Sequence, residues 1–360
     1  MPPLNILIIG CSVAGPTLAT FLLLSPLPPD QKPHITILER SSAPRTNGQN
    51  VDIRGAGVTI IRKLGLESVI RDSTTGEEGV QWVGARNQVW ASFAADKTGK
   101  TQGPTADIDI MRGRLAELIY NRSKQASEKV QQSGGAGIEY IFGDYLDSID
   151  QSSTRKMVWG DDSENNHVKR LDAFGAFFSM PRGPTETMWR RWYHAAGRRG
   201  IMVRPDQQIG KSTVLMTIVN DKDERLAEVS QGGTLAQKAL MKAYFDDSGW
   251  ENERILKEMA DTDDFYYGII AQVHMEWWSK GRVVLLGDAG YCASPFSGMG
   301  TTLTLDGAYN LAGSLLRHPN DHDAAFNYYE TAMRPIVEKT QKLCRACLTS
   351  STLRLHGAYG

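Results

Sequence analysis

The first 39 residues place the strongest constraint on the fold of this chain. Residues 4–9 (LNILII) form a short apolar run that is typical of a buried parallel strand, and residues 34–38 (HITIL) form another. Between them lie a glycine-containing turn, residues 10–15, and a helical pattern, residues 16–24. Strand, turn, helix and strand in this order predict a βαβ unit with two parallel strands.

The turn, GCSVAG, fits the dinucleotide-binding template G-x-G-x-x-G with serine in place of the second glycine. Gly10 would make the tight turn, Ser12 is small enough to let backbone approach a pyrophosphate, and Gly15 would allow close packing of helix on strand. Val13 and Ala14 lie at the helix start, where unpaired N–H groups face a phosphate. The alternative is a plain βα turn without a ligand.

An acid stands where a ribose-binding residue is expected. Glu39 ends the second strand, 24 residues after Gly15, and favours an unphosphorylated adenosine ribose, as in FAD or NAD. Arg40 beside it would suit a 2′-phosphate, but with Glu39 present we favour a solvated surface charge. The turn, its context and Glu39 together predict dinucleotide binding.

Composition narrows the class of protein. The 360 residues suffice for two domains, and 41% hydrophobic with 22% charged residues is ordinary for a globular protein. A net charge of −1 predicts no nucleic-acid partner. The longest apolar run, residues 18–27, is far shorter than the roughly 20 residues of a membrane span. Four cysteines are too few for a disulfide scaffold, and no secretory signal is visible, so we expect a cytoplasmic location.

Periodicity divides the rest of the chain into segments of different character. Helical patterns cover residues 57–71, 112–130, 234–246, 250–260, 301–317 and 321–342, and a strand pair is expected at residues 80–83 and 89–93. Strand-like runs dominate residues 138–275. A β-rich segment therefore lies between two α/β segments.

Residues 281–302, GRVVLLGDAGYCASPFSGMGTT, form an unusual strand–loop–helix. An apolar run, expected to be a buried strand, leads into Asp288, and a turn-rich stretch with Pro295, Gly298 and Gly300 precedes the next helix. Either this is ordinary loop chemistry with a helix-capping aspartate, or the exposed backbone holds a group that is not protein.

Four segments in this order resemble the FAD-dependent monooxygenases of the p-hydroxybenzoate hydroxylase type, which include salicylate hydroxylases and tetracycline-inactivating monooxygenases. They are IIGCSVAG with Glu39 and Arg40, GQNVDIRGAG with Arg54, IDIMRGRLAELI with Arg112, and GRVVLLGDAGYCASPFSGMGTTL. The resemblance covers residues 4 to about 342. It implies an α/β protein: a Rossmann-like FAD-binding domain with an inserted β-rich substrate domain.

The resemblance also implies domain boundaries. The FAD-binding domain would comprise residues 1–75, 106–160 and 276–342, and the substrate domain residues 76–105 and 161–275. Residues 343–360 would form an irregular tail. Trp189, Trp192 and Tyr193 fall in the β-rich segment, where they would pack in the core or line a substrate pocket.

The same family places the flavin. Asp288 would bond the ribityl chain or the waters around the pyrophosphate. Arg112 would contact FAD, and Arg54 would lie between flavin and substrate. The helix after Gly300 would direct its N-terminus at the N1/C2 edge of the flavin ring. The residues that would pass beside the ring include Pro295, Gly298, Met299 and Gly300.

The activity implied is oxygenation of a small organic substrate, either aromatic or a secondary metabolite. NADPH or NADH would reduce FAD, and dioxygen would supply the oxygen atom. The sequence identifies no catalytic side chain and no metal site. A catalytically impaired flavin-binding relic is the alternative, and an NAD-dependent dehydrogenase is a further one that the Gly-Asp block argues against.

One family block is missing. Members usually carry Ala-Asp-Gly followed by a serine and an arginine, but here YLDSID at residues 145–150 runs directly into QSSTR at residues 151–155. We therefore expect an internal deletion of roughly two strands and weaker FAD binding. Cys344 and Cys347 are interpreted as helix-surface thiols, and Asp321-His322-Asp323 as a helix N-cap with first-turn acids.

Overall fold

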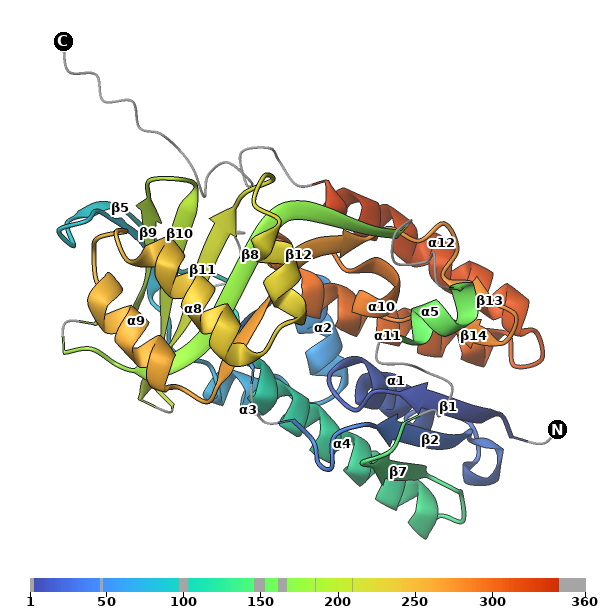
Figure 1. Cartoon of the computed structure of the whole chain (residues 1–360). Coiled ribbons are helices and arrows are strands. Elements are labelled where there is room, and N and C mark those ends of the chain that lie inside the picture. The colour runs from blue at the N-terminus through green and yellow to red at the C-terminus, as the bar shows by residue number, and fades with distance from the viewer. Residues whose placement is uncertain are drawn as a thin grey trace. The chain divides into compact units, whose positions relative to one another are not determined.

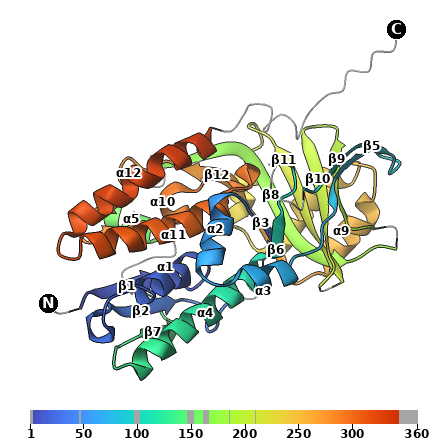
Figure 2. The same ribbon diagram turned by 180° about the vertical axis from the view of Figure 1, so that it is seen from behind.

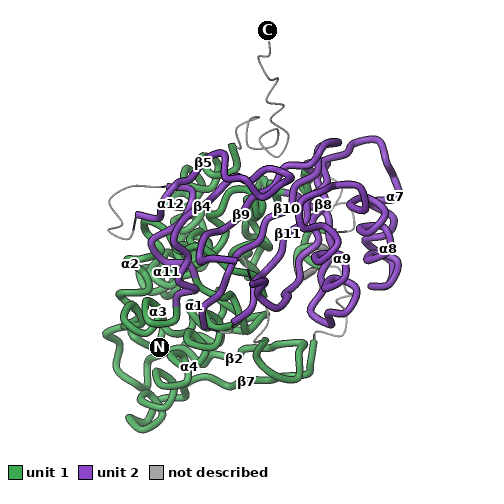
Figure 3. The backbone as a smooth tube through the Cα atoms, turned by 90° about the vertical axis from the view of Figure 1, so that its left-hand side faces the viewer, with its two compact units in different colours: residues 1–73, 110–169, 272–342 green, residues 74–109, 170–271, 343–360 purple. Residues whose placement is uncertain are grey.

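The computed structural model describes residues 3–45, 48–96, 103–145, 153–160, 167–184, 186–208 and 210–342. These residues form two compact units (Figure 3). Unit 1 comprises residues 1–73, 110–169 and 272–342, and unit 2 contains residues 74–109 and 170–271. Each unit is therefore assembled from separate stretches of chain. That unit 1 is the FAD-binding domain and unit 2 the substrate domain remains a prediction.

Unit 1 contains the predicted βαβ unit. β1 (Asn5–Ile9), β2 (His34–Glu39) and β7 (Ile138–Phe142) form a parallel sheet in the order β1-β2-β7. α1 (Ala14–Leu23) connects β1 to β2 and packs with α4 (Arg112–Gln132) on one face of the sheet (Figures 1 and 2). Alternate strand residues such as Ile35 and Ile37 are buried there because strand side chains alternate between faces.

The remaining elements of unit 1 carry or flank the predicted site residues that lie outside the βαβ unit and α4. They are the strands β3 (Asn50–Ile53), β6 (Ile108–Met111, on the boundary between the units), β13 (Ser279–Lys280) and β14 (Val283–Val284), the helices α2 (Ala56–Lys63), α3 (Glu67–Asp72), α5 (Ser153–Trp159), α10 (Asp288–Tyr291), α11 (Gly300–Arg317) and α12 (His322–Gln341), and the short 3-10 helices η1 (Pro29–Gln31) and η3 (Pro295–Ser297). α11 packs against α1, α2 and α12 (Figure 1).

Two expectations for unit 1 are wrong in detail. The single helix over residues 57–71 is two helices, α2 and α3, because Gly65 adopts a φ of +74° and ends the first. The buried strand before Asp288 is only the two residues of β14, both half-buried. Leu285 is buried, but its N–H donates to the carbonyl of Trp278, so the apolar run reflects packing of a hairpin end rather than a long strand.

Unit 2 is built on a seven-stranded sheet in the order β12-β8-β11-β10-β9-β4-β5. Its elements are β4 (Gly79–Val83), β5 (Val89–Ala94), β8 (Val168–Pro181), β9 (Trp189–Ala195), β10 (Arg199–Asp206), β11 (Lys211–Val219), β12 (Phe265–Val273), α7 (Arg225–Glu228), η2 (Val229–Gln231), α8 (Thr234–Phe245) and α9 (Asn252–Asp261). α8 and α9 cover one face, where Phe178, Ile201 and Met216 are buried (Figure 1). The β-rich prediction for this segment is confirmed.

The three aromatic residues of β9 divide between the faces of this sheet. Tyr193 belongs to the core under α8 and α9, and its hydroxyl donates to the carbonyl of Ser248 at 2.6 Å. Trp189 and Trp192 are half-buried. Tyr193 is therefore a core residue, and Trp192 lies on the opposite face because it is the adjacent strand position.

Among the helices that the structure describes, none is long and apolar enough to cross a membrane.

Candidate functional site

The glycine turn between β1 and α1 has the geometry of a phosphate cradle. Gly10 has a φ of +107°, a conformation that favours glycine, and its N–H donates to the carbonyl of Leu38 at 2.8 Å. A Cβ atom on Gly15 would lie 2.2 Å from the carbonyl oxygen of Gly10 and 2.9 Å from Cγ2 of Ile8. Both glycines are therefore required by the backbone path.

The N-terminus of α1 is available to an anion. Val13 is the N-cap residue and no side chain caps the helix. The N–H groups of the first turn and the positive end of the helix dipole therefore face the turn without a capping side chain. Ser12 and Ala14 are half-buried beside it. This cradle fits the pyrophosphate of a dinucleotide such as FAD.

Glu39 lies at the end of β2, beside the cradle. Its Oε2 accepts the N–H of Cys11 at 2.9 Å, and its Oε1 accepts the N–H of Ser41 at 3.0 Å. Burial by itself would raise the pKa of Glu39, but these two N–H groups and Arg45, 3.8 Å away, hold it below its usual value. The carboxylate is therefore ionised at neutral pH. Arg40, the next residue, is exposed.

A second cluster forms around the start of α11. The N–H of Arg54 donates to Oγ1 of Thr302 at 3.0 Å, and the Thr302 hydroxyl contacts the carbonyl of Arg54 at 3.3 Å. The guanidinium of Arg54 pairs with Asp52 at 2.9 Å. These contacts join segments 248 residues apart in the sequence. Thr302 and Asp52 were not singled out from the sequence, although both lie within quoted family segments, GRVVLLGDAGYCASPFSGMGTTL and GQNVDIRGAG.

Asp288 lies at the same helix end. It is exposed and begins α10, and its Oδ1 would lie 3.9 Å from a Cβ atom on Gly300. Met299 is the N-cap residue of α11 and no side chain caps that helix either. The structure thus places Asp288 beside Gly300 and the uncapped start of α11.

The loop between α10 and α11 has a defined backbone shape. Ser294 has a φ of +73°, and its Oγ accepts the N–H of Phe296 at 3.2 Å. Pro295 opens the 3-10 helix η3, and Gly298 follows with a φ of +61°. A non-glycine residue in the left-handed region is strained by about 1–3 kcal/mol and is often found at functional sites.

Arg112 lies at the start of α4, not at the start of α11. Arg112 is the first residue of α4 and is exposed; its N–H donates to the carbonyl of Gln49 at 2.9 Å. The two clusters are connected through helix packing, since Phe21 of α1 contacts Tyr309 of α11 edge to face at 4.9 Å between ring centroids. All predicted cofactor residues lie in unit 1.

Arg155 is a residue that the prediction did not include. It lies on α5, is 6% exposed, and donates from Nη1 to the carbonyl of Ala289 at 3.1 Å, one residue after Asp288. The resemblance of QSSTR to the family block was the available signal. The junction at residues 150 and 151 lies outside the described residues.

Other sequence features have structural explanations. Asp321 is the N-cap residue of α12 and accepts the N–H of Ala324 at 2.9 Å, so that prediction is confirmed. Cys344, Cys347 and the predicted tail, residues 343–360, lie outside the described residues. Within the described ranges, no group of three or more His, Cys, Asp or Glu side chains is placed to hold a metal ion.

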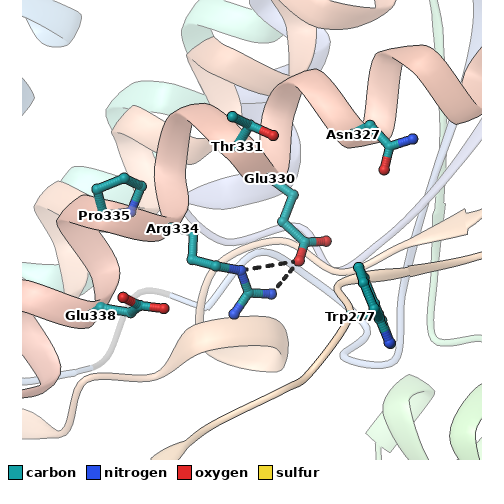
Figure 4. Close-up of a pocket in the computed structure, with 7 residues that line it drawn as sticks. All are labelled: Trp277, Asn327, Glu330, Thr331, Arg334, Pro335 and Glu338. Carbon is teal, nitrogen blue, oxygen red and sulfur yellow. Dashed lines mark hydrogen bonds and ion pairs between the residues drawn. The ribbon is translucent and has the colours of Figure 1, made fainter.

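A cavity of about 390 Å³ in unit 1 lies away from the predicted site residues (Figure 4). It lies along α12, and the ion pair between Arg334 and Glu330 forms part of its lining. Its lining residues are Trp277, Asn327, Glu330, Thr331, Arg334, Pro335 and Glu338.

Comparison with known proteins agrees with this geometry. Residues 151–343 match the family described as "FAD binding domain". The chain is 32% identical over 372 residues to the FAD-dependent monooxygenase asL6 of Sarocladium schorii, covering 94% of this chain and 86% of that one. It is 31% identical to the monooxygenase CTB7 of Cercospora beticola, over 86% of this chain and 79% of that one.

The solved structure of the tetracycline destructase Tet(51) has the same fold. It superposes with a TM-score of 0.76 at 26% identity, covering 99% of this chain and 94% of that one. The chain therefore belongs to the FAD-dependent monooxygenases, enzymes that bind FAD and use dioxygen to oxygenate a small molecule, and has the fold of the p-hydroxybenzoate hydroxylase type.

Proposed function

We propose that this chain is an NAD(P)H-dependent monooxygenase that inserts one oxygen atom from dioxygen into a small aromatic or secondary-metabolite substrate. The observation that carries the proposal is that both clusters of predicted FAD residues are formed within one unit. The similarity to tetracycline destructase Tet(51), named for a polycyclic substrate, supports an aromatic substrate class.

The first cluster would hold the adenosine end of FAD. The pyrophosphate would lie against the N–H groups of Ser12, Val13, Ala14 and Gly15, where the uncapped helix end favours negative charge. Each oxygen of Glu39 accepts one N–H and retains a lone pair for the ribose hydroxyls. The exposed side chains of Arg40 and Arg112 are further candidates for contacts to FAD.

The second cluster would hold the flavin end. Asp288 would bond the ribityl chain or the waters around the pyrophosphate, and Arg54 would lie at the edge of the ring. Pro295, Gly298, Met299 and Gly300 would pass beside the ring. FAD supplies the oxygenation chemistry when bound. The uncapped N–H groups of α11 would stabilise negative charge on the ring edge.

Unit 2 would supply contacts to the substrate. The face of its sheet opposite α8 and α9 carries Trp192 stacked on His194, with ring centroids 5.6 Å apart. Phe177 and Tyr266 contact one another at 6.3 Å between centroids and lie on strands of the same sheet. Aromatic rings of this kind bind flat organic molecules by stacking.

The proposal is tested with the purified full chain. We expect a flavin absorption spectrum, bleaching of that spectrum under anaerobic conditions by NADPH or NADH, and reoxidation by dioxygen. A bound flavin that neither nicotinamide reduces would show the flavin-binding relic instead. A protein that binds NAD but no flavin, even at millimolar FAD, would contradict the proposal.

A single substitution tests the flavin end of the site. Asp288→Asn keeps the shape of the side chain but removes its charge, so FAD should bind about 10- to 100-fold more weakly, as for loss of a charge-assisted bond of roughly 1.5–3 kcal/mol. Asp323→Asn is the matched control, because Asp323 is also an exposed first-turn aspartate. Equal FAD affinity in the two variants would contradict the assignment of Asp288.

A further inference from the structure

We propose that Gln272 and Gln341 are positioning residues that fix the loop of residues 292–299, here called the flavin loop, in the shape required to receive the flavin ring. This inference rests on the proposed function, which places Pro295 to Gly300 beside the ring. Neither glutamine belongs to a sequence motif, and both lie in unit 1.

Gln341 joins the flavin loop to the end of β12. It is the last residue of α12, and its Nε2 donates to the carbonyl of Val273 at 2.7 Å and to the carbonyl of Cys292 at 3.1 Å. The N–H of Val273 also donates to the carbonyl of Cys292, at 3.0 Å. The first carbonyl of the flavin loop therefore accepts two hydrogen bonds.

Gln272 completes the connection from the opposite side. Its side chain is buried, with 2% of the residue exposed, and its Nε2 donates to the carbonyl of Ala293 at 3.3 Å and to the carbonyl of Gln341 at 3.0 Å. One amide group thus bonds the second loop residue and the end of α12. The strand β12, the helix α12 and the flavin loop are tied together by two side-chain amides.

The orientation of the Gln272 amide follows from its partners. Because two carbonyl oxygens face one end of the amide, that end must be the NH₂ group, and Oε1 then accepts from Nε2 of His274 at 3.0 Å. The backbone N–H of His274 donates to the carbonyl of His167 at 2.8 Å, which holds the backbone of His274 in place. The amide therefore has one hydrogen-bonding arrangement rather than two.

These bonds lie immediately before the strained part of the loop. Cys292 and Ala293 precede Ser294, whose φ of +73° is unfavourable for a non-glycine residue. Such a conformation persists only where the surrounding structure over-determines it. The two glutamines supply that constraint at its N-terminal side, and the helix start at Gly300 supplies it at the other.

The loop shape matters for the cofactor because the flavin would contact its backbone. If the carbonyls of Cys292 and Ala293 lose their donors, Ser294 is free to leave the left-handed region. The backbone from Pro295 to Gly300 would then no longer be preformed, and FAD binding would have to order it. A loosened loop therefore predicts weaker FAD binding and an altered flavin environment, not a globally unfolded protein.

The test compares Gln341→Glu with Gln131→Glu. Both replace an amide donor by a carboxylate of the same shape at a helix C-terminus. Gln131, in the last turn of α4, donates to the carbonyl of Ala136, which follows that helix and is far along the chain from the loop. Gln272→Met is a second variant, which keeps the side-chain length without the amide. Hydrogen exchange of the apo protein, FAD titration and the visible spectrum of bound flavin are measured.

We expect Gln341→Glu and Gln272→Met to raise amide exchange at residues 293–303 by tenfold or more, with exchange at residues 10–24 unchanged. FAD should bind about 5- to 30-fold more weakly, and the flavin absorption bands should shift. Gln131→Glu should show none of these changes. Unchanged exchange in the loop, or an equal rise throughout unit 1, would overturn the positioning role.

A further outcome separates this inference from the proposed function. If loop exchange rises while FAD affinity and the flavin spectrum stay unchanged, the amides do hold the loop but the loop does not contact the flavin. That result would overturn the inference, because it would show that the flavin does not lie against the loop. Failure of the loop to loosen would instead overturn it while leaving the proposed FAD site untouched.

Discussion

At the scale of single residues, Gly15 shows how one side chain decides whether the cradle forms. An added Cβ would overlap the Gly10 carbonyl at 2.2 Å, far below any real contact, and the obstructing atom is backbone.

Asp306 is a buried acid whose charged form the fold disfavours. It is 8% exposed within α11, where burial raises the pKa of its carboxyl and the Asn310 amide only partly offsets this.

Gly15→Ala should separate α1 from β1. We expect a loss of unfolding free energy of about 1–3 kcal/mol from overpacking, together with weaker FAD binding because the cradle opens. Thermal unfolding and FAD titration measure both. Gly313→Ala is the control, since a Cβ there meets no atom within 4 Å and alanine favours a helix interior. Equal stability of the two variants would contradict this explanation.

Asp306→Asn should stabilise the protein at neutral pH. Because the folded-state pKa of Asp306 lies above its unfolded value of 3.8, its favourable contribution is present below that pH and is lost as the pH rises through the folded pKa. The melting temperature of Asp306→Asn should therefore exceed that of the original chain by more at pH 7 than at pH 4. A difference independent of pH would show that Asp306 does not titrate in this way.

At the scale of elements, the two ends of α1 differ in how their backbone groups are capped. Its N-terminus has no side-chain cap, and we propose that the pyrophosphate of FAD binds there. Beyond its C-terminus, Nζ of the buried Lys32 donates to the carbonyls of Leu23 and Ser25 at 2.7 and 2.6 Å. A cation at a helix C-terminus satisfies free carbonyls and opposes the dipole.

Lys32→Met tests this C-terminal cap. Methionine keeps the apolar stem but leaves two carbonyls without their donor, so the free energy of unfolding should fall by about 1–3 kcal/mol. Chemical denaturation measures the change. Lys129→Met, at an exposed position in the last turn of α4, is expected to change stability by less than about 0.5 kcal/mol. Equal effects would indicate that the Lys32 bonds contribute nothing.

At the scale of the whole molecule, the described parallel sheet of unit 1, β1-β2-β7, is unusual in the exposure of one of its faces. Such sheets are normally buried on both faces, but Leu7 and Ile9 of β1 are 52% and 44% exposed on the face opposite α1. The sequence predicts an internal deletion before residue 151, and the junction itself lies outside the described residues. Unit 1, the predicted FAD-binding domain, is formed from three separate stretches of chain.

The purified chain is therefore expected to be partly free of FAD and to be restored by adding it. With FAD at about 100 times its dissociation constant, binding should add about 2.7 kcal/mol to the free energy of unfolding. The melting temperature should rise with FAD concentration and not with riboflavin, which lacks the pyrophosphate. Tight stoichiometric FAD in the purified protein would show that the missing block was not needed. An equal rise with riboflavin would show that the cradle does not bind the pyrophosphate.

The sequence by itself determined the βαβ unit, its glycine turn and the helix start at Arg112, and it placed the start of α11 one residue late, at 301 rather than at Gly300. These depend on periodicity over a few residues and on the steric needs of glycine, which are local properties. The family resemblance of the surrounding segments supported the same elements. The prediction of a buried strand before Asp288 was wrong in its length, because an apolar run indicates burial but does not reveal whether a partner strand exists.

Only the tertiary structure decided which distant segments meet. It placed Arg54 against Thr302, Arg155 against Ala289, and both glutamines against the flavin loop. β4 lies beside β9, with Gly79 opposite Trp189, although more than a hundred residues separate them. Such contacts leave no periodic signal in the sequence, because they arise from the packing of whole elements. Which partner a buried donor or acceptor bonds is decided only when that packing is complete.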